Sequence, residues 1–273
     1  MSIPHEALEF ALTVADAAGG RIMSHFRHCN TDYKPDGSEV TIADREAETL
    51  IREMIAHRFP DHDILGEEFG DSGRRAGRPL WVIDPIDGTT SFTWGIQAFG
   101  TLIALLEGNE PVLGVIHMPA LEETVYAARG GGCWFRAGRA AAERVRVAAC
   151  SNLSDALVSL SGVHATDIGP ESDSPRYQLS KLLRKARKIR FCGDCLQHAL
   201  VCRGRIHAAI DTVMQPWDIA ALVPCVEEAG GVATSLAGTR DNVVFSGSLL
   251  TSANEAVHRE LLDCLRPVET SSH

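Results

Sequence analysis

The sequence lacks several features that would place it in a special class of protein. It has no apolar run of about eighteen residues, so no transmembrane span is expected. The segment from Met1 to Glu6 has neither the basic part nor the apolar part of a signal peptide, and we expect a cytoplasmic protein. Positive charge is scarce, because 26 Lys and Arg face 36 Asp and Glu, for a formal net charge of −10. This balance argues against a general nucleic-acid-binding surface.

Cysteine is present, but its spacing does not indicate a disulfide framework. The eight cysteines are spread from Cys29 to Cys264, which is typical of reduced thiols in a chain without a secretion signal. Only Cys192-Gly-Asp-Cys195 has the spacing of a redox or zinc motif, and a zinc site would need a second pair. A redox or zinc protein that uses Cys192 and Cys195 is kept as an alternative, which metal analysis and thiol titration would test.

The order of apolar segments predicts two closely packed halves, 1–150 and 151–273, with the seam near Cys150 to Ser154. At 273 residues the chain can form one large domain or two such halves. Helical spacing predicts helices over 6–26 and from about 40 to 59. Short apolar runs bounded by turn residues then predict an antiparallel or mixed sheet, with strands at 100–106, 112–117, 124–128, 133–135 and 145–148. The second half alternates strands and helices, as α/β proteins do, over 156–161, 176–187, 188–192, 196–203 and 206–211.

One stretch, from Trp81 to Phe92, combines buried and acidic residues in an unusual way. Trp81 to Ile83 predict a short buried strand, which ends at Asp84 because Pro85 cannot donate a ladder hydrogen bond. Asp87-Gly88 then favours a turn, and Thr89 to Phe92 can open a helix whose free N–H groups would bind an anion. Two carboxylates so close to a buried strand need a positive partner, such as a divalent cation. Taken alone, they could equally be turn-capping residues.

Three other acidic positions have a structural explanation of their own. Thr41 and Asp44 have the spacing of a capping box at a helix start. Gly66-Glu67-Glu68 has the composition of a solvated loop. Asp218 follows Pro216 in what would be the first turn of a helix, where the helix dipole favours a carboxylate, and Pro224 should interrupt that helix.

Together these motifs resemble those of the inositol monophosphatase-like family of metal-dependent phosphatases. Asp-Pro-Ile-Asp-Gly-Thr, from Asp84 to Thr89, resembles the central motif of that family residue for residue. Thr-x-x-Asp at Thr41 and Gly-Glu-Glu at Gly66 precede it in the order that the family has, and Trp217-Asp218 followed by Glu-Ala-Gly-Gly resembles a later signature. The resemblance covers almost the whole chain. It implies a layered αβαβα sandwich, of mixed α+β and α/β character, with the acidic residues gathered between the two halves.

The resemblance also implies a set of metal ligands, namely the carboxylates of Glu67, Asp84, Asp87 and Asp218 and the carbonyl oxygen of Ile86. Hard oxygen ligands without a paired His or Cys favour Mg²⁺ over Zn²⁺, and we expect two or three ions. One ion would lower the pKa of a bound water and another would stabilise the leaving oxygen. Glu67 and the Thr89 hydroxyl would position the water and accept its proton, while Asp44 orients Thr89.

The substrate is expected to be a small-molecule phosphate ester. Backbone N–H groups at Gly88, Thr89 and Thr90 would hold the phosphate, next to Asp87 and Asp218. Phe99-Gly-Thr, Val112-Leu-Gly-Val-Ile and Gly193-Asp194 resemble the histidinol-phosphatase branch most, although many of its members have Arg or Lys where this chain has Thr90.

Asp194 and Asp211 correspond to positions near the group attached to the phosphate, where two carboxylates would attract the cationic end of histidinol phosphate. Alternatively, Asp194 caps a helix that starts at Cys195 and Asp211 merely ends a strand. Inositol 1-phosphate is the alternative substrate, followed by fructose bisphosphate or a nucleotide.

Two further implications complete the interpretation. The family is commonly dimeric, so a homodimer is expected. A non-catalytic phosphate or metal binder with the same fold is the competing class, and Mg²⁺-dependent phosphate release from a generic phosphomonoester would separate the two.

Overall fold

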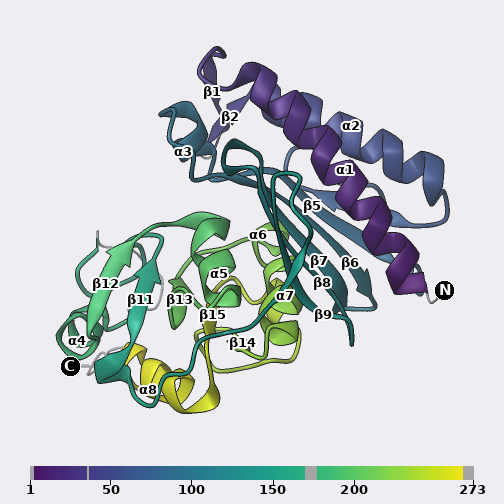
Figure 1. Ribbon diagram of the computed structural model, residues 1–273. Helices are drawn as coiled ribbons and strands as arrows, with labels where there is room; N and C mark the ends of the chain where they lie inside the picture. Colours follow the sequence, from purple (N-terminus) through teal and green to yellow (C-terminus); the bar gives the residue numbers. More distant parts are fainter. Residues whose placement is uncertain (1–2, 36, 170–176, 267–273) are drawn as a thin grey trace.

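The computed structural model describes residues 3–35, 37–169 and 177–266 and has the layered arrangement expected from the sequence (Figure 1). Helices α1 (Ile3–His25) and α2 (Ile42–Arg58) cover one face of a large sheet. Helices α5 (Asp194–Cys202), α6 (Pro216–Ile219) and α7 (Leu222–Glu228) lie between that sheet and a second one. Helices α4 (Leu179–Lys185) and α8 (Glu255–Leu265) cover the far side of the second sheet. The predicted αβαβα order is therefore confirmed.

Three hydrophobic clusters fill the spaces between these layers. One cluster, which includes Ile51 and Trp81, joins α1 and α2 to the large sheet. A second, which includes Leu102 and Val226, joins the large sheet to α5 and α7. The third, which includes Val158 and Leu261, lies between the second sheet and its outer helices. The middle cluster contains residues from both halves of the chain, so the boundary near residue 150 stays a prediction about domains.

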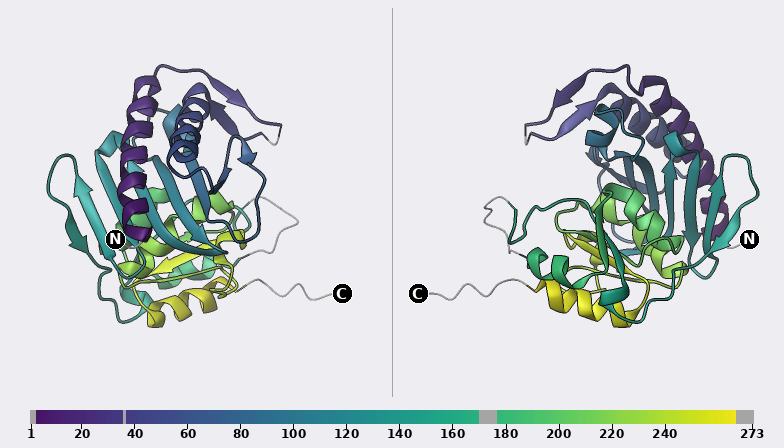
Figure 2. Two further views of the ribbon diagram at one scale, coloured as in Figure 1. Left: turned by 90° about the vertical axis from the view of Figure 1, so that its right-hand side faces the viewer. Right: turned by 60° about the vertical axis from the view of Figure 1, so that its left-hand side comes forward.

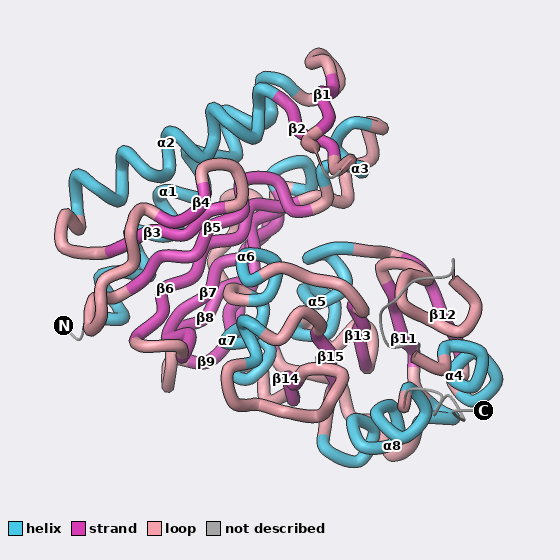
Figure 3. The backbone as a smooth tube through the Cα atoms, turned by 180° about the vertical axis from the view of Figure 1, so that it is seen from behind, coloured by secondary structure: helices cyan, strands magenta, loops and turns pink. Residues whose placement is uncertain are grey.

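The large sheet has eight strands in the order β10-β9-β8-β7-β6-β5-β3-β4 (Figure 3). Its neighbours pair antiparallel except for β3 and β5, which are parallel, as the prediction of an antiparallel or mixed sheet allows. The strands are β3 (Asp63–Gly66), β4 (Gly70–Asp71), β5 (Leu80–Asp87), β6 (Gly100–Glu107), β7 (Glu110–Met118), β8 (Glu123–Ala128), β9 (Gly132–Ala137) and β10 (Glu143–Val145). Strands β5 to β7 have almost continuous burial, as expected for a sheet covered on both faces.

The second sheet has five strands in the order β12-β11-β13-β15-β14. They are β11 (Leu157–Leu160), β12 (Lys188–Phe191), β13 (Ala208–Asp211), β14 (Val232–Thr234) and β15 (Leu249–Ser252). Strands β12, β11 and β13 are parallel, as the alternation of strand and helix predicts, and β15 pairs antiparallel with both β13 and β14. The helix predicted from residue 176 begins at Leu179, and residue 176 itself lies outside the described residues.

Local differences from the sequence expectations have physical causes. Strand β5 runs to Asp87 rather than ending at Asp84, because it tolerates Pro85 at an irregularity in its pairing. A hairpin of β1 (Thr31–Tyr33) and β2 (Glu39–Thr41) precedes α2 and was not predicted, because strands of three residues carry too little pattern. Helix α1 passes through Gly19 unbroken, and a Cβ at Gly19 would lie 2.6 Å from the His117 ring.

The site described below lies where the two halves of the chain meet. Figure 2 shows the β1–β2 hairpin and α3 (Thr89–Thr93), which follows the carboxyl end of β5, opposite the second half of the chain. No helix in the described part of the chain is long and apolar enough to cross a bilayer.

Candidate active site

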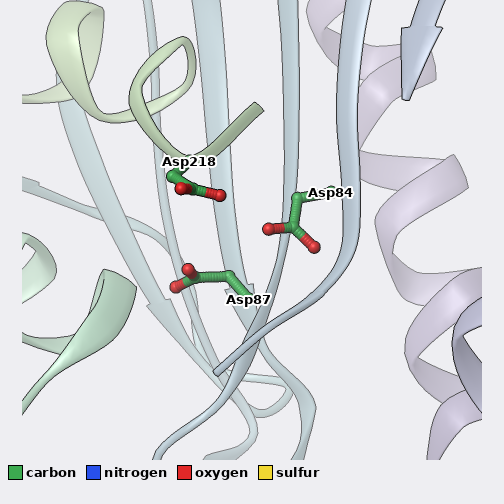
Figure 4. A group of neighbouring side chains, drawn as sticks. All are labelled: Asp84, Asp87 and Asp218. Carbon is green, nitrogen blue, oxygen red and sulfur yellow. The ribbon is translucent and has the colours of Figure 1, made fainter. Parts of the chain in front are cut away.

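Two aspartates on β5 face one space because the strand is irregular between them. In a regular strand successive side chains alternate between faces, so residues three apart would point to opposite sides. The pairing of β5 with β6 shifts register between Asp84 and Asp87, and the Thr101 hydroxyl donates to the Pro85 carbonyl oxygen at 2.9 Å within this segment. Such a bulge re-aims the side chains that follow it. Both carboxylates therefore point into the same space (Figure 4).

Asp218 reaches the same space from the second half of the chain. Pro216 starts α6, and the Asp218 carboxylate accepts a hydrogen bond from the backbone N–H of Gln215 at 2.7 Å. The cap expected from the sequence is thus present. Carboxylate oxygens of Asp218, Asp84 and Asp87 all lie within 4.8 Å of one another. The Asp218 side chain therefore both caps α6, through the oxygen that accepts from Gln215, and contributes to the acidic cluster.

The start of α5 is capped by Asp87 rather than by Asp194. Asp87 Oδ2 accepts a hydrogen bond from the backbone N–H of Cys195 at 2.5 Å. Asp194 makes no side-chain cap; it has a left-handed φ of 51° and follows Gly193, whose φ is 77°. A non-glycine residue in this region is strained and is enriched at functional sites. The carboxylate of Asp194 instead turns toward α3, where Ser91 Oγ donates to it at 3.5 Å.

Gly88 permits this approach of Asp194. Its φ is 87°, and a Cβ at Gly88 would lie 2.8 Å from Asp194 Oδ2 and 3.0 Å from the Ala98 carbonyl oxygen. Both the left-handed conformation and the lack of space therefore require glycine at this position. Asp194 from the second half consequently lies against the turn that the first half uses to start α3.

Glu67 comes from the turn between β3 and β4 and is paired with a lysine. Lys34 Nζ donates to Glu67 Oε1 at 2.8 Å and to Glu68 Oε1 at 2.7 Å. Burial works against the lysine charge, but these hydrogen bonds and the two negative charges outweigh it and raise the pKa of Lys34 above its usual value. Burial raises the pKa of Glu68 to about 7, against the opposing effect of Lys34.

These elements surround an open cavity of about 420 Å³. Its lining combines the acidic residues with the turn that starts α3 and with the hairpin before α2: Tyr33, Gly37, Ser38, Glu39, Glu67, Asp84, Ile86, Asp87, Gly88, Thr89, Thr90, Asp194 and Asp218. The cavity has the size of a small-molecule site.

Comparison with known proteins identifies the family and the fold. A model of the inositol monophosphatase family matches residues 4–269, nearly the whole chain. The chain belongs to the inositol monophosphatase family. The predicted family is thereby confirmed.

Among its relatives, the histidinol-phosphatase of Chlorobaculum parvum is 39% identical over 258 residues, which cover 93% of this chain and 95% of that protein. The fructose-1,6-bisphosphatase/inositol-1-monophosphatase of Thermotoga maritima is 34% identical over 267 residues, covering 96% and 97%. The solved structure of the Thermotoga maritima IMPase matches with a TM-score of 0.82 at 32% identity, covering 95% of this chain and 96% of that one. These relatives are phosphatases, which confirms the expected enzyme class, a phosphoric monoester hydrolase.

The inositol monophosphatase family is metal-dependent, and the acidic cluster of this member suits a metal ion. Burial first, and then repulsion from neighbouring carboxylates, raises the pKa of Asp84 and of Asp87 well above the usual range. The same causes raise the pKa of Asp218 to about 7, although the Gln215 N–H opposes them. Asp84 Oδ1 is buried and has no hydrogen-bond partner among the described residues. A divalent cation would relieve the repulsion and satisfy this oxygen.

The expected contact between Asp44 and Thr89 is not formed as a hydrogen bond between described residues. The Thr89 hydroxyl donates to the Ile86 carbonyl oxygen at 3.1 Å rather than to Asp44. Asp44 Oδ2 accepts from the backbone and the hydroxyl of Thr41, as the capping box predicts, while its buried Oδ1 has no partner. Burial raises the pKa of Asp44 to about 6. The orientation of Thr89 by Asp44 stays a prediction.

Asp211 is placed differently from the other predicted residues. Its carboxylate is buried at the end of β13 and accepts hydrogen bonds from Gln197 at 2.5 Å and from the His198 ring at 2.7 Å. It does not appear among the residues that line the cavity. Its contact with a substrate therefore stays a prediction, and in this structure its partners are protein side chains.

Sequence reasoning missed Lys34 and Tyr33, both in the unpredicted hairpin. A lysine beside a Pro-Asp-Gly turn has no pattern of its own. The usable signal was indirect, because two adjacent glutamates near a metal site would need a cation to neutralise them.

Proposed function

We propose that this chain is a Mg²⁺-dependent phosphomonoesterase whose substrate is L-histidinol phosphate, hydrolysed to L-histidinol and phosphate in histidine biosynthesis. The observation that carries the proposal is that an acidic cluster and a separate carboxylate, that of Asp194, line the same cavity. Asp84, Asp87 and Asp218 form a cluster suited to a metal, and Asp194 lies beside it, where the organic part of a phosphate ester would extend. The similarity to the Chlorobaculum histidinol-phosphatase supports the same substrate.

The metal site would consist of Glu67, Asp84, Asp87, Asp218 and the carbonyl oxygen of Ile86, holding two or three Mg²⁺. All these donors are hard oxygens, and no thiol or imidazole is needed among them. When bound, the ions supply an activated water and neutralise charge on the phosphate and on the leaving oxygen.

The chain's own residues do the remaining work. Glu67 and the Thr89 hydroxyl are suited to hold a water, since both line the cavity, and the Glu67 carboxylate is the group that can accept its proton. In this structure the Thr89 hydroxyl donates to the Ile86 carbonyl oxygen, so its oxygen can accept a hydrogen bond from a water at the same time. Backbone N–H groups of Gly88, Thr89 and Thr90, at the start of α3, would bind phosphate oxygens because the first N–H groups of a helix have no partner within it.

Recognition of the organic part would depend on negative charge. Burial and the nearby Asp211 raise the pKa of Asp194 to about 6, which means that its negative charge is destabilised. A cationic group of the substrate would relieve this destabilisation by pairing with the carboxylate. Histidinol phosphate presents an ammonium group and an imidazole, whereas inositol 1-phosphate presents hydroxyl groups. A charge-assisted hydrogen bond to Asp194 would distinguish the two.

Inositol 1-phosphate is the second candidate. The Thermotoga relative, whose name includes inositol-1-monophosphatase, is 34% identical to this chain, against 39% for the Chlorobaculum histidinol-phosphatase. The test is phosphate release by the purified protein from histidinol phosphate, inositol 1-phosphate, fructose 1,6-bisphosphate and a nucleotide monophosphate. We expect the highest kcat/KM for histidinol phosphate, and a clear preference for inositol 1-phosphate would contradict the substrate assignment. A homodimer and a cytoplasmic location are proposed with it.

A further inference from the structure

A buried glutamate on α2 supports the turn that carries Glu67. The side chain of Glu48 is 0% exposed. Its Oε2 accepts a hydrogen bond from the backbone N–H of Glu68 at 2.7 Å, and its Oε1 accepts one from the N–H of Phe69 at 3.1 Å. Residues 67–69 form the turn of the β3–β4 hairpin, because Gly66 pairs with Gly70. The turn is therefore folded around the carboxylate of Glu48.

The buried charge of Glu48 is neutralised by Arg52 one helical turn later. Arg52 Nε donates to Glu48 Oε1 at 2.8 Å, and the same guanidinium donates to the Gly70 carbonyl oxygen. The two side chains hold the hairpin from both sides, one through N–H groups and the other through a carbonyl. Losing the carboxylate would leave two backbone N–H groups without their acceptor and would take the charge partner away from the partly buried Arg52 guanidinium, which is costly.

Gly66 makes room for this arrangement. A Cβ at Gly66 would lie 2.3 Å from Glu48 Oε1, closer than any contact that real Cβ atoms show. Gly66 is not among the residues with positive φ, so its glycine serves the close approach of Glu48 rather than a left-handed backbone. An alanine at this position would displace the carboxylate while leaving both acidic residues in the chain.

We propose that Glu48 is a positioning residue, which holds the 67–69 turn so that the Glu67 carboxylate faces the metal site. The inference rests on the proposed function, because Glu67 matters as a ligand only if the site binds a metal. Glu67 sits on a three-residue turn, and Lys34 competes for its carboxylate. Groups that orient metal ligands contribute about 10–100-fold to metal affinity or activity when they are removed.

A matched control exists elsewhere in the chain. Glu228, at the end of α7, also accepts two backbone N–H groups in a β-hairpin turn, from Gly130 at 2.6 Å and Gly132 at 2.7 Å. That turn lies at the other end of the large sheet: Ala128 pairs with Leu113, which pairs with Leu105, which in turn pairs with Trp81 near the start of β5. Glu228→Gln thus disturbs the same kind of contact away from the metal site.

The experiment compares wild type, Glu48→Gln, Gly66→Ala and Glu228→Gln in two measurements. The first is the rise in Tm that Mg²⁺ causes in protein previously treated with EDTA, which reports binding without turnover. The second is the Mg²⁺ concentration that gives half-maximal phosphate release, together with KM for the ester at saturating Mg²⁺. If Glu48→Gln does not fold, Gly66→Ala provides the test from the other side of the same contact.

We expect the Glu48 and Gly66 variants to need about 10–100-fold more Mg²⁺ and to show a smaller Mg²⁺-induced rise in Tm. KM for the ester at saturating Mg²⁺ should change little. Glu228→Gln should lower Tm in EDTA but respond to Mg²⁺ as wild type does. Equal Mg²⁺ responses in all four proteins would overturn the role of Glu48. A wild-type protein that does not respond to Mg²⁺ would overturn the proposed function itself.

Discussion

Asp87 Oδ2 accepts a hydrogen bond from the backbone N–H of Cys195 at 2.5 Å, so the carboxylate that ends β5 also caps α5. This contact joins the two halves of the chain at the candidate metal site. The buried Asp87 carboxylate therefore has two roles, since it caps α5 and belongs to the acidic cluster that suits a metal ion. Its two functions can be separated by substitution.

The first prediction concerns Asp87→Asn. Asparagine can still accept the Cys195 N–H, so the free energy of unfolding should change by no more than about 1 kcal/mol. Loss of the negative charge from the metal site should remove turnover, and the measurements are phosphate release and urea unfolding. Asp61→Asn, which changes an exposed carboxylate, is the control and should retain activity. Near-wild-type turnover by Asp87→Asn with Mg²⁺ would show that Asp87 is not a metal ligand.

A second prediction follows from the pairing of Lys34 with Glu67 and Glu68. Lys34→Met should destabilise the metal-free protein by about 1–3 kcal/mol, because it leaves two close, partly buried carboxylates without a cation. Mg²⁺ should recover more of the free energy of unfolding in this variant than in wild type. Chemical denaturation in EDTA and in Mg²⁺ measures both values. Arg21→Gln, which breaks an exposed pair with Glu46, is the control; an equal effect of both substitutions would contradict the prediction.

A third prediction concerns acid stability and His258. Burial lowers the pKa of His258 from 6.5 to about 4, and its ring bonds the hydroxyls of Thr234 and Ser252 at 2.8 Å each. A pKa lowered by folding means that the unfolded chain binds the proton more readily. The stabilising contribution is therefore complete above pH 6.5 and is lost as pH falls toward 4, by up to about 3 kcal/mol.

His258→Gln should flatten this part of the pH dependence, measured by urea unfolding between pH 7 and pH 4. The raised pKa values of the acidic cluster act in the opposite direction, so the difference between variant and wild type is the relevant quantity. His57→Gln, which changes an exposed histidine on α2, should leave the pH dependence as it is. Parallel curves for wild type and His258→Gln would contradict the assignment.

A fourth prediction tests recognition of the substrate by Asp194. Asp194→Asn should raise KM for histidinol phosphate and leave KM for a phosphomonoester with a neutral organic group nearly unchanged. The physical reason is the loss of one charge-assisted hydrogen bond, which is about twice as strong as a neutral one. Steady-state kinetics with both esters measures the effect. A parallel loss on both would mean that Asp194 acts through the strained start of α5 rather than through the cation.

The layered order was implied by the resemblance to the family, whereas the long elements could be predicted from their own patterns. Strands such as β6 and β7 are continuous apolar runs, and α2 has both its capping box and its apolar face in the sequence. The bulge directs the side chains of Asp84 and Asp87 toward the same cavity. It could not be derived from the local pattern, since Pro85 indicated the end of the strand. The outcome depends on pairing with β6, which is a tertiary effect.

The candidate site was predictable where a motif marks it and not where tertiary contacts form it. Asp84, Asp87 and Asp218 come together as expected. A cap on α5 by Asp194 was the alternative to its substrate-binding role, because an aspartate beside a helix start is a common cap. The structure instead uses Asp87, from 108 residues earlier in the chain. The ion pairs of Lys34 likewise depend on a hairpin too short to recognise in the sequence.

The most direct test of the account is phosphate release from histidinol phosphate by EDTA-treated protein after Mg²⁺ or Ca²⁺ is added back. We predict no turnover in EDTA, full recovery with Mg²⁺ and poor recovery with Ca²⁺, because Ca²⁺ has longer bonds and takes more ligands than the compact octahedral shell of Mg²⁺. Full turnover in EDTA would contradict a metal-dependent reaction, and equal rates with Ca²⁺ would contradict a site built for Mg²⁺.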